Sequence, residues 1–278
     1  MKVKHLSILA GAGSLLLAGG ANADFLGIDI IDFTNFLSGA GAGEATGTGV
    51  GSTVGMHPNA GVRTAYAAAG LRTFRVYAMF NAADRVLAHG GHSSGTAWAS
   101  STSGSFFNQV EFDDYNNATH YNTPSFGGFT PTSRAWDTFG TIGRHVGDSN
   151  TNLYANNEAF AAESGNLAGN WSMSDSGWFS FNPLSADNIA KQATGSATDA
   201  NVQGVAADGI YRVLLLQITV GAGEDVEGNI GLLGGQLAGV ASAYEVTGEA
   251  LYYNSVPAPG ALALLGLAGL AGARRRRA

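Results

Sequence analysis

Residues 211–220 read Tyr-Arg-Val-Leu-Leu-Leu-Gln-Ile-Thr-Val and are the most apolar of the strand-like segments in this 278-residue chain. Aliphatic and β-branched residues favour strands. An apolar run with little alternation is typical of a strand that is covered on both faces. We therefore expect residues 210–220 to form a central strand.

A second segment, residues 72–80, alternates between two sets of side chains. Four apolar residues fall on one face and three others on the opposite face: Phe74, Val76, Ala78 and Phe80 against Arg75, Tyr77 and Met79. A repeat of two residues predicts a strand. Residues 84–88 are then expected to be the strand that returns beside it.

The rest of the central region contains several shorter strand candidates, and helix-period patterns are scarce. The candidates are residues 25–33, 106–112, 135–142, 177–181 and 243–253. Short helical turns are expected at 81–86 and 154–162, and Gly-rich surface loops at 39–55 and 90–104. Many short strands between Gly-rich turns predict an all-β, antiparallel two-sheet sandwich that is jelly-roll-like, with Gly-rich loops and short helices.

The N-terminal residues 1–23 have the pattern of a signal peptide. Lys2 and Lys4 supply positive charge, an uncharged apolar stretch follows, and Ala21-Asn22-Ala23 is a small-x-small cleavage pattern. We expect a mature chain that begins at Asp24. The alternative is a retained anchor helix, but the apolar run is shorter than the ~20 residues that a membrane span needs.

The C-terminal residues 256–278 combine three features in a fixed order. Val256, Pro257, Ala258 and Pro259 come first, then an uncharged Leu-rich stretch, and then Arg274, Arg275, Arg276 and Arg277. The prolines prevent regular pairing and leave an extended segment. The arginines remain on the cytoplasmic side of a membrane. The stretch between them is expected to be a helix too short for a permanent span.

This order of features resembles the PEP-CTERM sorting signal of bacterial exported proteins. The resemblance implies that an exosortase, a membrane sortase, recognises the tail and passes the protein to the cell surface or extracellular matrix, after transient anchoring in the inner membrane. In this chain Ala258 stands where the family has Glu, so the processing enzyme stays unassigned. The alternative is a plain anchor that is not cleaved. Stretches such as 73–86, 136–143 and 211–220 also resemble those of exported β-sandwich proteins with the same tail, which implies no particular chemistry.

The two ends leave residues 24–255 as one extracellular domain with a strong acidic excess. Six of the fourteen Lys and Arg residues lie in the ends, whereas all twenty-one Asp and Glu residues lie between them. An acidic surface disfavours nucleic acid and anionic lipid. We therefore expect membrane contact through the tail only. Because the chain has no cysteine, thiol catalysis and disulfides are excluded.

Two polar clusters are candidates for Ca²⁺ binding, since they offer oxygen ligands. The first contains Asp148, Asn150 and Asn152, and the second contains Asp113 and Asp114. The first fails the EF-type pattern at its sixth and twelfth positions. A polar turn is the favoured interpretation of each, so no cofactor is predicted and calcium stays an alternative.

No catalytic constellation stands out in the sequence. No nucleophile-elbow motif frames a serine. His89 and His92 have no third metal ligand close by in sequence. Paired carboxylates for glycoside hydrolysis depend on the fold and stay open. We therefore favour a function that is not enzymatic.

Tryptophans are candidates for stacking on sugar rings, although large aromatic residues more often lie in the core. Trp136 and Trp178 fall in strand candidates and are expected to be buried, whereas Trp98 falls in a Gly/Ser loop and is expected to be exposed. The sequence thus predicts a structural or adhesive surface or matrix protein. The alternative is a carbohydrate-binding or glycoside-cleaving module that acts on exopolysaccharide.

Overall fold

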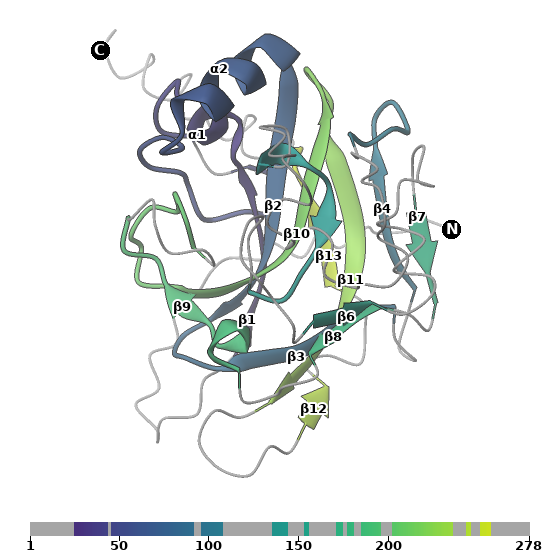
Figure 1. Ribbon diagram of the computed structural model, residues 1–278. Helices are drawn as coiled ribbons and strands as arrows, with labels where there is room; N and C mark the ends of the chain where they lie inside the picture. Colours follow the sequence, from purple (N-terminus) through teal and green to yellow (C-terminus); the bar gives the residue numbers. More distant parts are fainter. Residues whose placement is uncertain are drawn as a thin grey trace, which may run out of the picture.

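Two antiparallel β-sheets pack face to face in the computed structural model of the protein (Figure 1). The structure describes residues 25–43, 46–91, 96–107, 135–143, 153–155, 171–174, 177–180, 185–195, 202–235, 243–245 and 251–256. The predicted all-β, antiparallel two-sheet sandwich is confirmed.

The first sheet is built around the apolar strand that contains residues 211–220. Its strands are β1 (Phe25–Asp32), β2 (Leu71–Phe80), β5 (Phe139–Gly140), β9 (Lys191–Gln192) and β10 (Tyr211–Gly221). The order is β1-β2-β10-β5, and β9 also pairs with β10. Residues 212–220 are buried on both faces, as the pattern predicted.

The second sheet is organised by β11, a strand that the sequence patterns did not reveal. Its strands are β3 (Arg85–Gly90), β4 (Ala97–Ser101), β6 (Leu153–Ala155), β7 (Trp171–Met173), β8 (Gly177–Ser180), β11 (Val226–Gly235), β12 (Ala243–Glu245) and β13 (Leu251–Asn254). β11 pairs with β3, β4, β12 and β13. The predicted single strand at 243–253 is therefore two short strands on the same partner.

The chain passes repeatedly from one sheet to the other. β2 and β3 are consecutive but lie in different sheets, and so do β10 and β11. The prediction that residues 84–88 return beside β2 is therefore wrong, because β3 pairs with β8 and β11 instead. Local alternation predicts a strand but carries no information on its partner. Crossing between sheets is a feature of jelly-roll-like sandwiches.

The two faces of the first sheet have different chemistry. Phe74 and Val76 of β2 share a face with Ile218 of β10, and this face packs towards the second sheet. The opposite face carries buried polar residues, among them Arg75, whose Nε donates to Gln217 Oε1 at 2.9 Å. The alternation read from the sequence thus separates the inter-sheet core from a second buried layer.

Two helices, α1 (Thr34–Ser38) and α2 (Ala60–Ala69), cover this second layer (Figure 1). Tyr66 of α2 donates from its hydroxyl to Thr73 Oγ1 at 3.0 Å. Asn59 caps the start of α2, and Gly70 ends it in the left-handed region at φ 62°. The helical turns predicted at 81–86 and 154–162 are wrong where the structure describes them, because β3 begins at Arg85 and β6 includes residues 154 and 155.

Residues 46–53 of the Gly-rich tract do not form a free surface loop as predicted but pack along the outer edge of β1. Thr46 Oγ1 donates to the backbone oxygen of Ile30 at 3.1 Å, and Thr53 is buried. A Cβ atom on Gly49 would collide with the same Ile30 oxygen. Glycine is therefore required where this segment approaches the strand.

Across the described ranges we find no helix with the length and apolar character needed to span a membrane. The two predicted terminal signal helices, residues 1–23 and the stretch after Val256, lie outside these ranges. Of the weaker strand candidate at 106–112, residues 106 and 107 are described and belong to no strand.

Candidate functional site

Trp98 differs from the other three tryptophans in its exposure. Trp136, Trp171 and Trp178 are buried, as the sequence predicted for the first and last of them. Trp98 is half-buried, but it lies in β4 rather than in the loop that the Gly/Ser-rich composition suggested. A strand fixes the direction of its side chain, which points away from the inter-sheet core.

Four residues on adjacent strands form a row on the solvent side of the second sheet. They are Ser172 of β7, Trp98 of β4, Asn229 of β11 and Tyr252 of β13, and each is directly opposite the next. Directly paired residues point to the same face of a sheet. We call these four residues the outward row.

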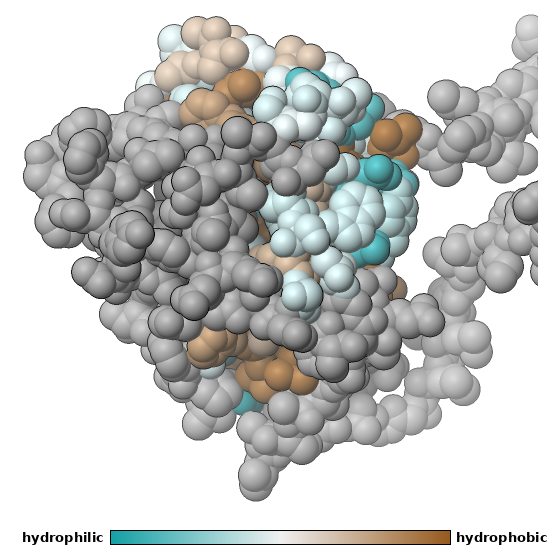
Figure 2. Space-filling model, turned by 90° about the vertical axis from the view of Figure 1, so that its right-hand side faces the viewer, coloured by the Kyte–Doolittle hydropathy of each residue, from teal (hydrophilic) through white to brown (hydrophobic). Residues whose placement is uncertain are grey.

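Burial along each strand confirms the direction in which the row points. In β7, Ser172 is exposed between two buried residues, and in β13 Tyr252 is 48% exposed before the buried Tyr253. Figure 2 views the side on which β4 and β7 lie, and neutral and hydrophilic residues gather there between grey atoms. The row is thus exposed at its two ends and half-buried at Trp98 and Asn229.

The ring of Tyr252 is held against the sheet by its hydroxyl group. Tyr252 Oη donates to Glu227 Oε2 on β11 at 2.7 Å, and Asn254 Nδ2 donates to the same Oη at 3.2 Å. Desolvation, and then the hydrogen bond to Glu227, raises the pKa of Tyr252, so the phenol stays protonated. The hydroxyl of Tyr252 thus reaches across to β11 while the residue stays 48% exposed.

Trp98 is anchored on β11 from the other side. The side-chain amide of Asn229 makes two hydrogen bonds. Its oxygen accepts from Trp98 Nε1 at 2.9 Å, and its nitrogen donates to the backbone oxygen of Gly228 at 3.2 Å. Both aromatic side chains thus fix their polar ends on β11. An amide and a carboxylate, those of Asn229 and Glu227, lie between them.

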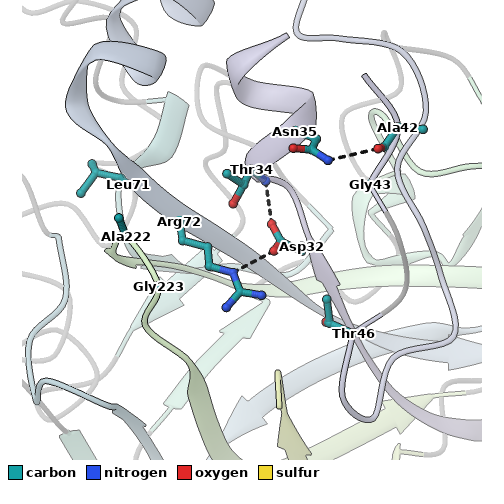
Figure 3. A pocket seen from close by; sticks show the side chains of 10 residues that line it. All are labelled: Asp32, Thr34, Asn35, Ala42, Gly43, Thr46, Leu71, Arg72, Ala222 and Gly223. Carbon is teal, nitrogen blue, oxygen red and sulfur yellow. Dashed lines mark hydrogen bonds and ion pairs between the residues drawn. The ribbon is translucent and has the colours of Figure 1, made fainter. Parts of the chain in front are cut away.

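A separate polar pocket of about 500 Å³ lies at one end of the sandwich (Figure 3). It is lined by Asp32, Thr34, Asn35, Ala42, Gly43, Thr46, Leu71, Arg72, Ala222 and Gly223. Arg72 Nε donates to Asp32 Oδ2 at 2.9 Å, and its Nη1 donates to Asp225 Oδ1 at 2.8 Å. The arginine of this pocket is thus paired with two carboxylates.

Unlike the outward row, the pocket is lined by no aromatic side chain. Asp32 Oδ1 also accepts from the backbone N–H of Thr34 at 2.8 Å, and Asn35 Nδ2 donates to Ala42 O at 3.1 Å. These groups satisfy one another and tie α1 to β1 and β2. We assign the pocket a structural role.

His89, a metal candidate of the sequence, is instead part of the core. Its ring stacks on Trp178 with centroids 4.9 Å apart, and its Nε2 lies 2.6 Å from Thr141 O. Burial lowers the pKa of His89 to about 3, against the opposing effect of that hydrogen bond. The ring is neutral and donates to the carbonyl. His92 lies outside the described residues.

The remaining predicted site residues are largely outside the described ranges. These are Ala21, Ala23 and Asp24 at the signal cleavage site, Asp113, Asp114, Asp148, Asn150 and Asn152 of the polar clusters, and residues 257–259 and 274–277 of the tail. Val256 is described and is 47% exposed. Where the structure does describe side chains, it groups no three His, Asp or Glu residues in a way that could hold a metal ion.

Sequence reasoning found one member of the outward row and missed the others. A strand pattern that could have revealed β11 and Asn229 is present in residues 226–230, Val-Glu-Gly-Asn-Ile, where polar residues alternate with apolar or small ones. Two glycines in or next to this segment reduced its resemblance to a strand. Comparisons with protein-family models, with curated proteins and with solved structures find no match.

Proposed function

We propose that this chain is a non-catalytic, exported surface or extracellular-matrix protein that binds carbohydrate through its outward row. The observation that supports binding is the arrangement of Trp98 and Tyr252 on either side of β11, with Asn229 between them. Aromatic faces stack on the C–H faces of sugar rings. Amide and carboxylate groups hydrogen-bond sugar hydroxyls.

Binding fits these side chains better than hydrolysis does. Glycoside hydrolysis needs two carboxyl groups roughly 5–10 Å apart, one of which donates a proton. On the outward face, Glu227 accepts a hydrogen bond from Tyr252. Asp32, which lines the pocket, and Asp225 both accept hydrogen bonds from Arg72, so both carboxylates are already paired with a cation.

The position of Val256 supports delivery through the C-terminal tail. Ser255 is fully buried, and the next residue, Val256, is 47% exposed. A segment that continues from this point begins at the surface of the sandwich, where a membrane sortase could reach it. With the signal pattern at residues 1–23, this favours export and PEP-CTERM-like sorting of the 24–255 domain.

A glycan array probed with the full chain in mild detergent tests carbohydrate binding. We expect binding to at least one glycan, and a loss of at least tenfold in Trp98→Ala and in Tyr252→Ala. Trp98→Phe and Tyr252→Phe keep an aromatic face and should retain most of the binding. Met56→Ala removes an exposed side chain outside the row and serves as the control.

Two outcomes would contradict the proposal. One is the absence of binding to any glycan on the array. The other is undiminished binding by the Trp98→Ala/Tyr252→Ala double variant, which would place the binding surface elsewhere. Thermal unfolding of each variant shows whether it is folded before its binding is interpreted.

A further inference from the structure

We infer, on the basis of the proposed function, that the ligand is a linear, uncharged polysaccharide that lies across the strands and is bound along its length rather than at its end. Three observations lead to this inference: the direction of the outward row, its exposed ends and its charge.

The outward row runs perpendicular to the strands. It crosses β7, β4, β11 and β13, one residue from each. Adjacent strands are about 4.8 Å apart, so the row extends over about 14 Å. One strand spacing is close to the length of a pyranose unit in an extended chain. The row therefore accommodates three to four consecutive sugars.

The two aromatic residues lie within this length, on either side of β11. Trp98 and Tyr252 are separated by two strand spacings, or about 10 Å between their Cα atoms. Because both side chains reach towards β11, their rings lie closer together than their Cα atoms. Both rings can therefore contact sugars of one polysaccharide chain that crosses the strands.

Both ends of the row are exposed, and Trp98 and Asn229 between them are half-buried. Ser172 lies at one end and is exposed, and Tyr252 lies at the other and is 48% exposed. Recognition of a chain terminus requires a wall that closes around the last sugar. The residues that line the pocket in Figure 3 include no aromatic side chain on which a sugar could stack.

The charge around the row disfavours an anionic polymer. Glu227 is exposed, and its carboxylate accepts from Tyr252 next to the row. Ser100 and Asn254, the residues paired with Glu227 on either side, are uncharged. Uronate or sulfate groups would approach this carboxylate, which pairs with no Lys or Arg among the residues that the structure describes. Neutral hydroxyl and acetamido groups meet no such repulsion.

Titration calorimetry of the full chain with three oligosaccharide series tests the inference. The series are β-1,4-linked glucose, β-1,4-linked N-acetylglucosamine and β-1,4-linked mannuronate, each from one to six units. We expect at least one neutral series to bind, with affinity rising at least tenfold between two and four units and then levelling off. The mannuronate series should bind at least tenfold more weakly at low salt.

Variants separate the role of length from that of charge. Trp98→Ala and Tyr252→Ala should each abolish the increase in affinity between oligosaccharides of two and four units. Trp98→Phe and Tyr252→Phe should keep this increase. Glu227→Gln should reduce the difference in affinity between the neutral oligosaccharides and the anionic mannuronate series.

The inference and the proposed function fail in different ways. An affinity that is already maximal with one sugar, stronger binding of the mannuronate series, or no binding of any of the three series overturns the inference. Binding on the glycan array that depends on Trp98 and Tyr252 would still leave the proposed function standing in those cases.

Discussion

Arg212 and Asp29 form an ion pair in which neither side chain is exposed to solvent. Arg212 Nη2 lies 2.8 Å from Asp29 Oδ2, and Asp208 Oδ2 accepts from the same nitrogen at 2.7 Å. Asp29 Oδ1 accepts from the backbone N–H groups of Val50 and Gly51 at 2.7 and 3.2 Å. One carboxylate thus joins β1, β10 and the segment that covers the edge of the first sheet.

Replacing Asp29 with Asn should destabilise the protein strongly. The substitution keeps the shape of the side chain but leaves the buried guanidinium of Arg212 with one carboxylate instead of two. Loss of a partner from a buried ion pair costs about 3–5 kcal/mol. Urea unfolding monitored by tryptophan fluorescence measures the change. Asp208→Asn, at a side chain that is 28% exposed, should cost less. Equal losses in the two variants would contradict this ranking.

Asp208 should make stability depend on pH in the acid range. Burial alone would raise its pKa, but hydrogen bonds from Arg212 and the Ile210 N–H outweigh it, and the pKa is lowered from 3.8. A lowered folded-state pKa contributes stability that is present above the unfolded value and is lost as pH falls through the folded value. The difference in unfolding free energy between the native chain and Asp208→Asn should therefore shrink below pH 3.8. A difference that stays constant from pH 5 to pH 3 would disprove the linkage.

His89 should make the free energy of unfolding depend on pH in a higher range than Asp208 does. Its pKa is lowered by burial from 6.5 to about 3, so protons bind preferentially to the unfolded chain below pH 6.5. Stability should fall by at most about 1.4 kcal/mol per pH unit between these values. His89→Phe keeps a ring beside Trp178 and should flatten this part of the profile. Urea unfolding at pH 7, 6 and 5 measures both slopes, and parallel slopes would contradict the prediction.

Processing of the tail should depend on its prolines as well as its arginines. Changing Pro257 and Pro259 to Ala should leave full-length protein in the membrane. Changing Arg274, Arg275, Arg276 and Arg277 to Ser should release unprocessed protein, since nothing then holds the tail on the cytoplasmic side. Mass spectrometry of displayed or released protein tests this. A mature chain that still ends in arginines would show that the tail is only an anchor, and a mature N-terminus at Met1 would exclude cleavage before Asp24.

Reductant should leave the melting temperature unchanged, because the chain has no cysteine. Millimolar Ca²⁺ should raise the melting temperature only if the clusters at Asp113 and Asp148 converge on one site, since a ligand stabilises the state that binds it. Calorimetry with and without Ca²⁺ measures the shift. Asp113→Asn and Asp148→Asn should each remove any increase.

The elements that could be predicted from sequence are those with a local pattern. β1, β2, β8 and β10 were found because burial on one or both faces selects apolar residues at every second position or in a continuous run. α2 was missed although Asn59 and Gly70 mark its ends. β11 was missed because Gly228 weakens the pattern. A Cβ atom there would collide with Trp98 O and with the ring of Tyr253, so close packing from both sides excludes any larger side chain.

The sequence by itself determined the all-β class, the central strand and the acidic charge, because each follows from composition or from neighbouring residues. Only the tertiary structure decided that β3 leaves the sheet of β2, and that Trp98, Asn229 and Tyr252 form one row. Strand pairing joins residues that are far apart in the chain, and a periodic pattern specifies which face a residue occupies but not which strand lies beside it.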